Sequence, residues 1–120
     1  MKYSFMTFSC PELTLNEAVA LALRFGYDGI EPRIQSGHKH GIEFDASQEA
    51  RRDAKQKAAD AGVALCCIAT SCRYADPETT DAMVEDTHRA IDLAADVGSR
   101  RLRVFGGNFP DSLSREAATE

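Results

Sequence analysis

The sequence has no run of lysines or arginines long enough to form a basic stripe, and its formal net charge is -5. Contacts to phosphates need clustered positive charge, so both features argue against a nucleic-acid partner. No window approaches the roughly 18 consecutive apolar residues of a membrane span, so we expect no membrane partner. The first residues, MKYSFMTFSCPE, lack the apolar length of a secretion signal, and we predict a cytoplasmic protein.

The sequence also lacks CxxC spacing, although it contains four cysteines. Cys66 and Cys67 are adjacent in an apolar run, where reduced thiols act as small core residues. The complete glycine-rich motifs GxGxxG and GxxxxGK(S/T) are missing as well. The pair Gly106–Gly107 therefore predicts a tight turn rather than a nucleotide site, although such a loop can present backbone amides to an anion.

The sequence does have a regular spacing of glycines. Gly26, Gly62 and Gly98 are 36 residues apart, and each follows a helical pattern and precedes a strand-forming run. Glycine is expected just after a helix end, where the backbone turns left-handed without a steric cost. A helix–glycine–strand unit repeated in this way is typical of an α/β fold.

The repeat predicts strands that alternate with helices. The expected strands are residues 3–8, 28–31, 63–69 and 102–105. The expected helices are residues 15–25, 46–61 and 79–97, and Thr14 and Glu17 have the spacing of a capping box at the first of them. Strands that alternate with helices indicate right-handed crossovers and a parallel sheet.

The faces of the second and third expected helices differ in character. In the second, alanines at 50, 54, 58 and 61 share one face that could lie close to a sheet, and the basic residues are expected to face water: Arg51, Arg52, Lys55 and Lys57. In the third, helical spacing predicts a buried face made of Val84, Thr87, Ile91 and Ala94.

The 120 residues fit one partial domain, an α/β fold of parallel (β/α) units. We predict the first four strands of a TIM (β/α)8 barrel, apparently truncated, because a complete barrel has about 250 residues. The last stretch, SLSREAATE, begins like a helix capped by Ser112 or Ser114 and has no C-terminal signal. A flavodoxin-like open sheet is the alternative, and it normally needs about five strands.

In either fold, function gathers on the loops that follow the carboxyl ends of the strands. The longest of these loops, EPRIQSGHKHGIEFD, holds two of the three histidines of the chain. Polar candidates on the loops are Glu31, Arg33, His38, His40, Ser71, Arg73, Asn108 and Asp111. Cys10 and Cys72 also lie near strand ends, but no histidine is placed beside either thiol as a base.

Each candidate has an alternative role. His38 and His40 could share a metal with Glu31, Asp45 or Cys72, or could form no site, because two histidines in a glycine-flanked loop are a weak signal. Glu31 could orient a polyol or a cation, or form an ion pair with Arg33 or Arg73. Arg73 could hold a phosphate or carboxylate, or be a solvated surface residue.

Four stretches in order carry a resemblance: FGYDGIEPRI, the GHKHG loop, DAGVALCCIATSCRY and AADVGSRRLRVFGG. Together they resemble the sugar phosphate isomerase/epimerase family with xylose-isomerase-like TIM barrels, over essentially the whole chain. The resemblance implies metal-dependent isomerases or epimerases of ketoses, sugar acids or polyols. In such enzymes a divalent cation (Mn, Mg, Co or Zn) stabilises an enediolate while carboxylates move a proton.

The resemblance also implies which parts this chain contributes. The family's metal ligands and acid/base pair come from later strands, so we expect no catalytic residue and no metal site in this chain. The first strands supply the substrate-facing rim, which corresponds here to Glu31, Arg33, His40, Ser71 and Arg73. We also assign His38 and Asn108 to this rim, with both histidines as substrate contacts or lid residues. A related endonuclease branch takes histidines from earlier strands, and this chain has none at the end of its third or fourth strand.

These assignments lead to three hypotheses. The first is that the chain is part of a sugar isomerase or epimerase, inactive by itself and able to self-associate through open sheet edges. The second is a non-catalytic α/β module that binds a ligand at its strand-end loops. The third is a half-barrel that pairs with a second copy of itself.

Overall fold

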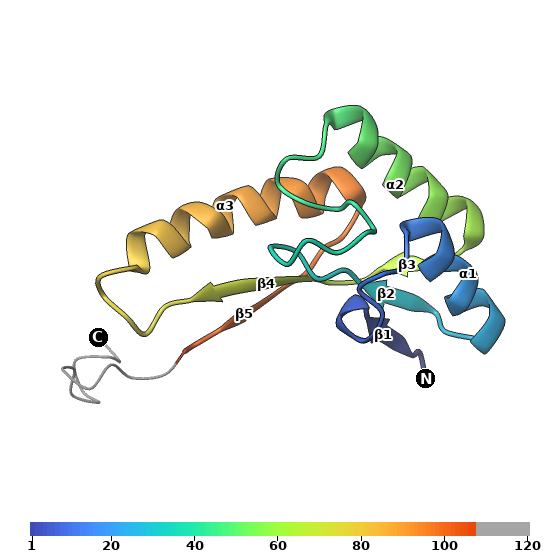
Figure 1. Ribbon diagram of the computed structural model, residues 1–120, viewed down its shortest axis with the longest axis horizontal. Helices are drawn as coiled ribbons and strands as arrows, with labels where there is room; N and C mark the ends of the chain where they lie inside the picture. Colours follow the sequence, from blue (N-terminus) through green and yellow to red (C-terminus); the bar gives the residue numbers. More distant parts are fainter. Residues whose placement is uncertain (108–120) are drawn as a thin grey trace.

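The computed structural model describes residues 1–107, in which strands and helices alternate (Figure 1). The strands are β1 (Ser4–Met6), β2 (Gly29–Glu31), β3 (Ala64–Leu65), β4 (Ile68–Arg73) and β5 (Leu102–Phe105). The helices are α1 (Leu15–Phe25), α2 (Gln48–Ala61) and α3 (Thr80–Val97), with a short 3-10 turn, η1 (Thr7–Ser9), after β1. The predicted site residue Asn108, the candidate Asp111 and the expected helix start at Ser112 or Ser114 lie outside the described residues.

The helix boundaries follow from capping residues that the sequence displays. Thr14 and Glu17 form the predicted capping box: the Glu17 N–H donates to Thr14 Oγ1 at 3.3 Å, and the Thr14 N–H donates to Glu17 Oε1 at 3.2 Å. The three helices end at Gly26, Gly62 and Gly98, whose φ angles of 74°, 69° and 83° are left-handed. The predicted bounds of α1 are confirmed, and α2 and α3 begin at Gln48 and Thr80, slightly later than expected.

All the strand pairs within residues 1–107 are parallel, and they form two groups, β1-β2-β3 and β4-β5, in which neighbouring strands follow the order of the chain. β2 pairs with β1 and with β3, and β4 pairs with β5. The two groups join where Arg33 pairs with Ala69: the Ile34 N–H donates to the Ala69 carbonyl at 3.0 Å, and the Ala69 N–H donates to the Pro32 carbonyl at 2.9 Å. A strand order that follows the chain is that of a (β/α) barrel wall, whereas a flavodoxin-like sheet changes order at its centre.

The third expected strand, residues 63–69, is divided into β3 and β4 at Cys66 and Cys67. Leu65 and Ile68 are both buried under the helices, yet they are three residues apart. In a regular strand such residues point to opposite faces, so one extra residue, as in a β-bulge, must change the alternation between them. The prediction of one continuous strand is therefore wrong at its centre.

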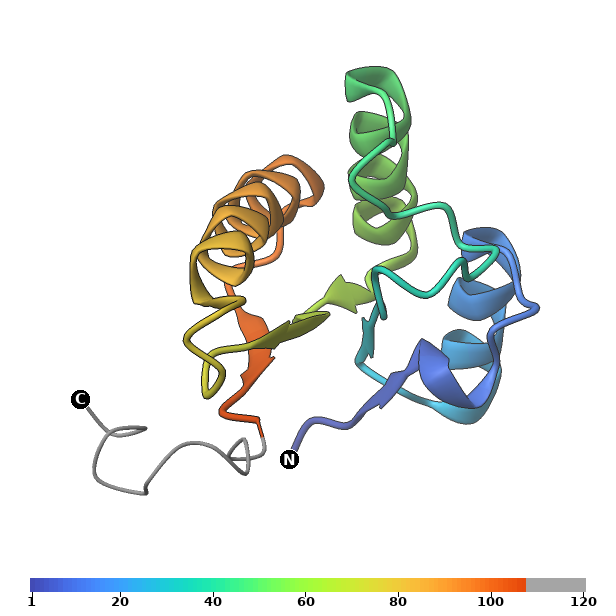
Figure 2. The same ribbon diagram turned by 60° about the vertical axis from the view of Figure 1, so that its left-hand side comes forward.

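The three helices within residues 1–107 lie on one side of the curved sheet, and no described helix covers the other side (Figure 1, Figure 2). The hydrophobic core fills the space between these two layers. Its largest fully buried apolar side chains are Ile30, Ile34, Ile42, Ile68 and Leu93. None of the described helices is long and apolar enough to cross a membrane.

The buried faces of α2 and α3 differ in part from the predicted ones. On α2, Ala54 and Ala58 are buried as expected, whereas Ala50 is exposed. On α3, the buried side chains are Ala90, Leu93, Ala94 and Val97. Val84 and Ile91 remain 42% and 49% exposed, so the predicted apolar face is wrong at these positions. The small alanines lie where α3 meets its neighbours, and they allow a closer approach of the backbones than larger side chains would.

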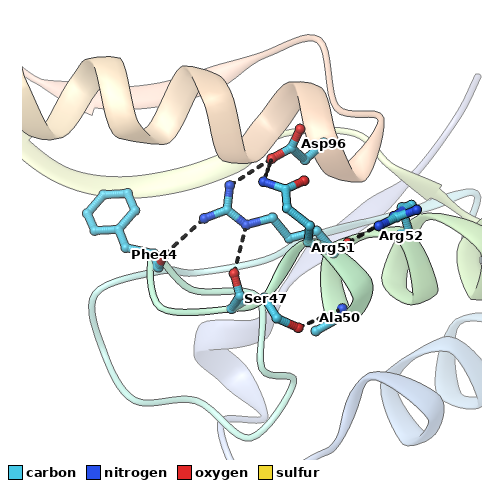
Figure 3. Close-up of polar contacts among 8 residues, drawn as sticks. Phe44, Ser47, Ala50, Arg51, Arg52 and Asp96 are labelled. Carbon is cyan, nitrogen blue, oxygen red and sulfur yellow. Dashed lines mark hydrogen bonds and ion pairs between the residues drawn. The ribbon is translucent and has the colours of Figure 1, made fainter.

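Arg51 does not face water as expected, because it joins α2 to α3 (Figure 3). Its Nη1 donates to Asp96 Oδ2 at 2.7 Å, and its side chain is only 11% exposed. Its Nη2 donates to the Phe44 carbonyl at 2.9 Å, and its Nε donates to the Ala46 carbonyl at 3.1 Å. One guanidinium thus fixes the end of the loop before α2 and ties it to α3, because its planar fork can serve several acceptors at once.

Candidate functional site

The candidate site lies at the carboxyl ends of β1, β2 and β4, and Arg33 is at its centre. Both backbone groups of Arg33 are held by side chains. The N–H of Arg33 donates to Thr7 Oγ1 at 2.8 Å, and its carbonyl accepts from His40 Nε2 at 2.9 Å. Because Thr7 follows β1 and His40 belongs to the loop before α2, three segments converge to fix this one residue.

The Arg33 side chain is also fixed. Its Nη1 donates to the Ala69 carbonyl at 3.2 Å, and its Nη2 donates to the Ser71 hydroxyl. The Ser71 N–H in turn donates to Gln35 Oε1 at 3.0 Å, so both chain segments are tied together. Burial lowers the pKa of Arg33, and the nearby cations Arg103 and Arg73 lower it further. A guanidinium keeps its charge despite such a shift, so this position presents a fixed cation with N–H groups left for a ligand.

Among the predicted site residues within 1–107, His40 is the most buried, with 6% of its surface exposed. Its Nδ1 accepts from the Ile42 N–H at 3.0 Å while its Nε2 faces the Arg33 carbonyl. This pattern requires a neutral ring with its proton on Nε2. Burial, the largest cause, lowers the pKa of His40, and the nearby His38 ring lowers it too, whereas the Arg33 carbonyl and Glu43 act in the opposite direction.

His38 lies beside His40 but has a different environment. It is half-buried, and its Nδ1 is 3.2 Å from Thr7 Oγ1. The ring centroids of the two histidines are 5.7 Å apart and meet edge to face. A shared metal would have to displace the backbone contacts of His40, because both of its ring nitrogens bond the main chain. Within residues 1–107, no three His, Cys, Asp or Glu side chains are grouped so that they could hold a metal ion.

Glu43 shapes the loop that carries the histidines. Gln35 has a left-handed φ of 63°, which costs a non-glycine residue of the order of 1 kcal/mol. Glu43 compensates for this strain: its Oε1 accepts from the Gln35 N–H at 2.6 Å, and its Oε2 accepts from the Gly37 N–H at 3.3 Å. Gln35 Nε2 also donates to Asp86 Oδ2 of α3 at 3.3 Å. The loop is therefore a built structure rather than a solvated turn.

Glu31 and Arg73 stand apart from this centre. Glu31 Oε1 accepts from Ser4 Oγ at 3.0 Å, and neither Arg33 nor Arg73 is within ion-pair distance of it. Arg73 ends β4 and lies 5.9 Å from the centroid of the Phe105 ring, on which Arg103 also packs at 4.7 Å. Both guanidinium groups therefore lie within cation–π range of the same ring.

The structure thus brings Arg33, Ser71, His38 and His40 together through direct or shared contacts, and leaves Glu31 and Arg73 at its margin. Sequence reasoning missed four participants: Thr7, Gln35, Glu43 and Arg103. The predicted strand of residues 3–8 includes Thr7, whereas β1 ends at Met6, so only a correct strand end would place Thr7 among the loop residues. For Glu43, the sequence carries no signal beyond its place in the long loop.

Cys10 and Cys67 are poor nucleophiles. Burial raises the pKa of the Cys10 thiol, and Glu12 adds to that effect. Burial likewise raises the pKa of the Cys67 thiol, with a further contribution from Glu31. Because the thiolate is the reactive form, both residues are less reactive than an ordinary cysteine at neutral pH.

Solved structures share this fold. The crystal structure of the probable 3-DHS dehydratase AsbF from Bacillus anthracis is similar at a TM-score of 0.69 and 20% identity, over 88% of this chain and 38% of that chain. A xylose isomerase domain protein from Planctomyces limnophilus is similar at a TM-score of 0.63 and 15% identity, over 99% of this chain and 44% of that chain. A Sinorhizobium meliloti protein gives a TM-score of 0.65 and 21% identity, over 98% and 41%.

These identities show a shared fold and no more, and the chain spans about two fifths of the length of each of these proteins. No curated protein is detectably similar in sequence. The family model described as "Xylose isomerase-like TIM barrel" matches residues 19–120, which is most of the chain. The parallel strands in chain order and the helices on one face agree with that match. The chain belongs to the xylose isomerase-like TIM barrel family.

Proposed function

We propose that this chain supplies the substrate-binding rim of a metal-dependent isomerase or epimerase that acts on a sugar, a sugar acid or a related polyol. The fixed guanidinium of Arg33 at the carboxyl ends of the strands is the observation that carries the proposal. In (β/α) barrels substrates bind at this end of the strands. Family membership supports the reaction class, and the side chains described here support the binding role.

The chain's own residues would bind and orient the substrate. Arg33 would donate from its remaining N–H groups to a carboxylate or to adjacent hydroxyl oxygens, because its other contacts hold the fork in one orientation. The Ser71 oxygen accepts from Arg33, which leaves its own proton for a substrate oxygen. His38 is half-buried in the loop between β2 and α2, and it would contact the substrate or cover it.

A divalent cation, when bound, would hold substrate oxygens and stabilise the charge of an enediolate. Residues 1–107 do not provide a ligand set for this cation, because no three of their His, Cys, Asp or Glu side chains are grouped so that they could hold a metal ion. We therefore assign the cation and the proton transfer to residues outside this part. His40 is held by the main chain through both nitrogens, so its role would be to position Arg33.

Binding of a sugar acid to the chain tests this proposal. D-gluconate is titrated into the purified protein and followed by NMR chemical shifts or calorimetry, with D-fructose as the neutral comparison. We expect gluconate to bind more tightly, and R33M to weaken that binding by about tenfold or more, because a charge-assisted hydrogen bond is worth about 1.5–3 kcal/mol. R33K, which keeps the charge and loses the fork, should fall between the two.

Two outcomes would contradict the proposal. The first is that R33M and the unchanged protein bind gluconate equally well while circular dichroism shows that both are folded. Arg33 would then not belong to the binding site. Turnover of D-fructose by the purified 120-residue chain with Mn²⁺ would show that the catalytic residues lie within it. The variant R52M serves as the control, because Arg52 is an exposed arginine on α2, outside the residues that form the site.

A further inference from the structure

Gln35 has a strained backbone at the point where the chain leaves the sheet. It is exposed, and it is the one non-glycine residue with a positive φ, 63°, among residues 1–107. A residue with a side chain keeps such an angle only where the surrounding structure holds it, and these positions cluster at functional sites. A glycine would remove the strain, as Gly37 and Gly41 do further along the same loop. The presence of glutamine therefore points to a use of its side chain.

The side chain of Gln35 continues the sheet at the residue where the backbone turns left-handed. Before that turn, the Ala69 N–H donates to the Pro32 carbonyl at 2.9 Å, and the Ile34 N–H donates to the Ala69 carbonyl at 3.0 Å. In a regular parallel ladder the Ser71 N–H, two residues further along β4, would donate to the Ile34 carbonyl. It donates instead to Gln35 Oε1 at 3.0 Å. The glutamine amide thus takes the place of a strand carbonyl.

Two carboxylates hold Gln35 in this position. Its Nε2 donates to Asp86 Oδ2 of α3 at 3.3 Å, so the amide oxygen is the atom that faces Ser71. Its backbone N–H donates to Glu43 Oε1 at 2.6 Å. One carboxylate therefore fixes the direction of the amide, and the other fixes the backbone that carries it. All of these contacts lie between residues 35 and 86.

Ser71 connects Gln35 to the centre of the site. Its hydroxyl accepts from Arg33 Nη2, while the Ala69 carbonyl accepts from Nη1 of the same guanidinium. The hydroxyl and the N–H that Gln35 holds belong to one residue, so fixing the backbone of Ser71 also limits the positions of its oxygen. Without the Gln35 acceptor, the Ser71 N–H would turn to water, and the end of β4 would lose this bond to the loop.

We propose that Gln35 is a positioning residue, whose amide fixes Ser71 and, through the Ser71 hydroxyl, the guanidinium of Arg33. The consequence for substrate binding rests on the proposed function, whereas the order of the Arg33 side chain can be measured without a ligand. A guanidinium that is already ordered loses less conformational entropy when it binds a carboxylate or a pair of hydroxyl groups. Gln35 thus raises the affinity for such a ligand without touching it.

Two substitutions separate the amide from the backbone strain. Q35M removes the amide and keeps both the length of the side chain and the strain of a non-glycine residue. Q35G removes the amide and the strain together, because glycine adopts left-handed angles freely. Q56M is the matched control: Gln56 Nε2 donates to Asp60 Oδ1 at 2.6 Å on the exposed side of α2, and neither residue makes a described contact with the site.

Heteronuclear NMR of the arginine side chains gives the first readout. The signals that are absent from R33M identify those of Arg33, whose fixed fork should give separate Nη resonances in the unchanged protein and in Q56M. We expect these resonances to merge in Q35M and in Q35G, whereas chemical denaturation should show that Q35G is the more stable of the two. Gluconate affinity is the second readout, and both Gln35 variants should bind about two- to tenfold more weakly than Q56M.

Separate Nη resonances in both Gln35 variants would overturn the inference, and so would merged resonances in the unchanged protein. Resonances that merge in only one of the two variants would assign the effect to the backbone and not to the amide, which would overturn it as well. The role in binding would be wrong if R33M weakened gluconate binding and neither Gln35 variant did. Failure of the proposed function looks different, because R33M would then bind gluconate as well as the unchanged protein does, whatever the Nη resonances show.

Discussion

Arg51 of α2 and Asp96 of α3 form an ion pair in which Nη1 and Oδ2 are 2.7 Å apart (Figure 3). The same guanidinium bonds the Phe44 and Ala46 carbonyls, so it couples the end of the site loop to two helices. Gln48 Nε2 also donates to Asp96 Oδ2, at 3.2 Å. The loop that carries the histidines is therefore anchored at its far end by one residue that is not part of the site.

Arg51→Ala should lower the free energy of unfolding by about 2 kcal/mol, because the Phe44 and Ala46 carbonyls lose their side-chain donor and regain water only in part. Chemical denaturation followed by circular dichroism measures this change. Arg52→Ala is the matched control: Arg52 is exposed on the same helix and has only a long contact, 3.4 Å, with the Gln48 carbonyl. It should change stability by less than about 0.5 kcal/mol. Equal effects of the two changes would contradict the anchoring role.

Asp96 should make stability depend on pH in the acid range. Its hydrogen bond with Arg51 is the largest cause that holds the pKa of Asp96 below its usual range. The unfolded chain therefore takes up the proton first as the pH falls below about 4, and the stabilisation is present above that pH and lost below it. Asp96→Asn should flatten the stability curve between about pH 4 and pH 2, as measured by denaturation at each pH. An unchanged slope would show that the ion pair contributes nothing to acid stability.

The sequence predicted the helices well because their ends are set by local chemistry. The Thr14–Glu17 capping box and the glycines at Gly26, Gly62 and Gly98 act within a few residues of the chain, so their effect is visible without the fold. The parallel α/β arrangement followed from the order of the elements. These features carry the prediction of a partial barrel, which the family match and the strand order support.

Features that depend on distant segments were not visible in the sequence. The partner of Arg51 is known only after α2 packs on α3, and a basic residue on a helix is otherwise expected in water. The change of alternation at Cys66 and Cys67 depends on which side chains meet the helices. The sequence pattern predicted which loops carry the candidate site, although it placed the end of the first strand too late to include Thr7 among the loop residues. Its internal bonds, such as that between Arg33 and Ser71, could not be predicted.

Gly29 in β2 should not tolerate a side chain. A Cβ added there would lie 3.0 Å from the Ala64 carbonyl oxygen and 3.2 Å from Cys66 Sγ, and the carbonyl belongs to the paired strand backbone. Gly29→Ala should therefore destabilise the protein by about 1–3 kcal/mol through overpacking, as measured by thermal and chemical unfolding. Gly106→Ala is the control, because a Cβ there meets no atom within 4 Å. If the two variants were equally stable, the close approach of the strands at Gly29 would be refuted.

His40 should make the protein less stable as the pH falls through the weakly acid range. Burial lowers the pKa of His40 in the folded chain, and the charged or titratable groups near it are Arg33, His38 and Glu43. The unfolded chain, with an ordinary histidine pKa of about 6.5, then binds the proton more readily than the folded chain. The contribution of neutral His40 to the free energy of unfolding is thus fully present above that pH. It declines below that pH, because the unfolded state binds more protons there. A charged ring could no longer accept from the Ile42 N–H.

The test compares the free energy of unfolding from about pH 7.5 to about pH 5 in the unchanged protein, in His40→Gln and in His88→Gln. We expect the decline to be reduced in His40→Gln and retained in His88→Gln, because His88 is exposed on α3 and makes no described hydrogen bond. The gluconate affinity of the unchanged protein should decline over the same range, since protonation of Nδ1 removes the acceptor of the Ile42 N–H and so disturbs the loop that holds His40 against the Arg33 carbonyl. A decline of stability that is the same in all three proteins would show that groups other than His40 cause it.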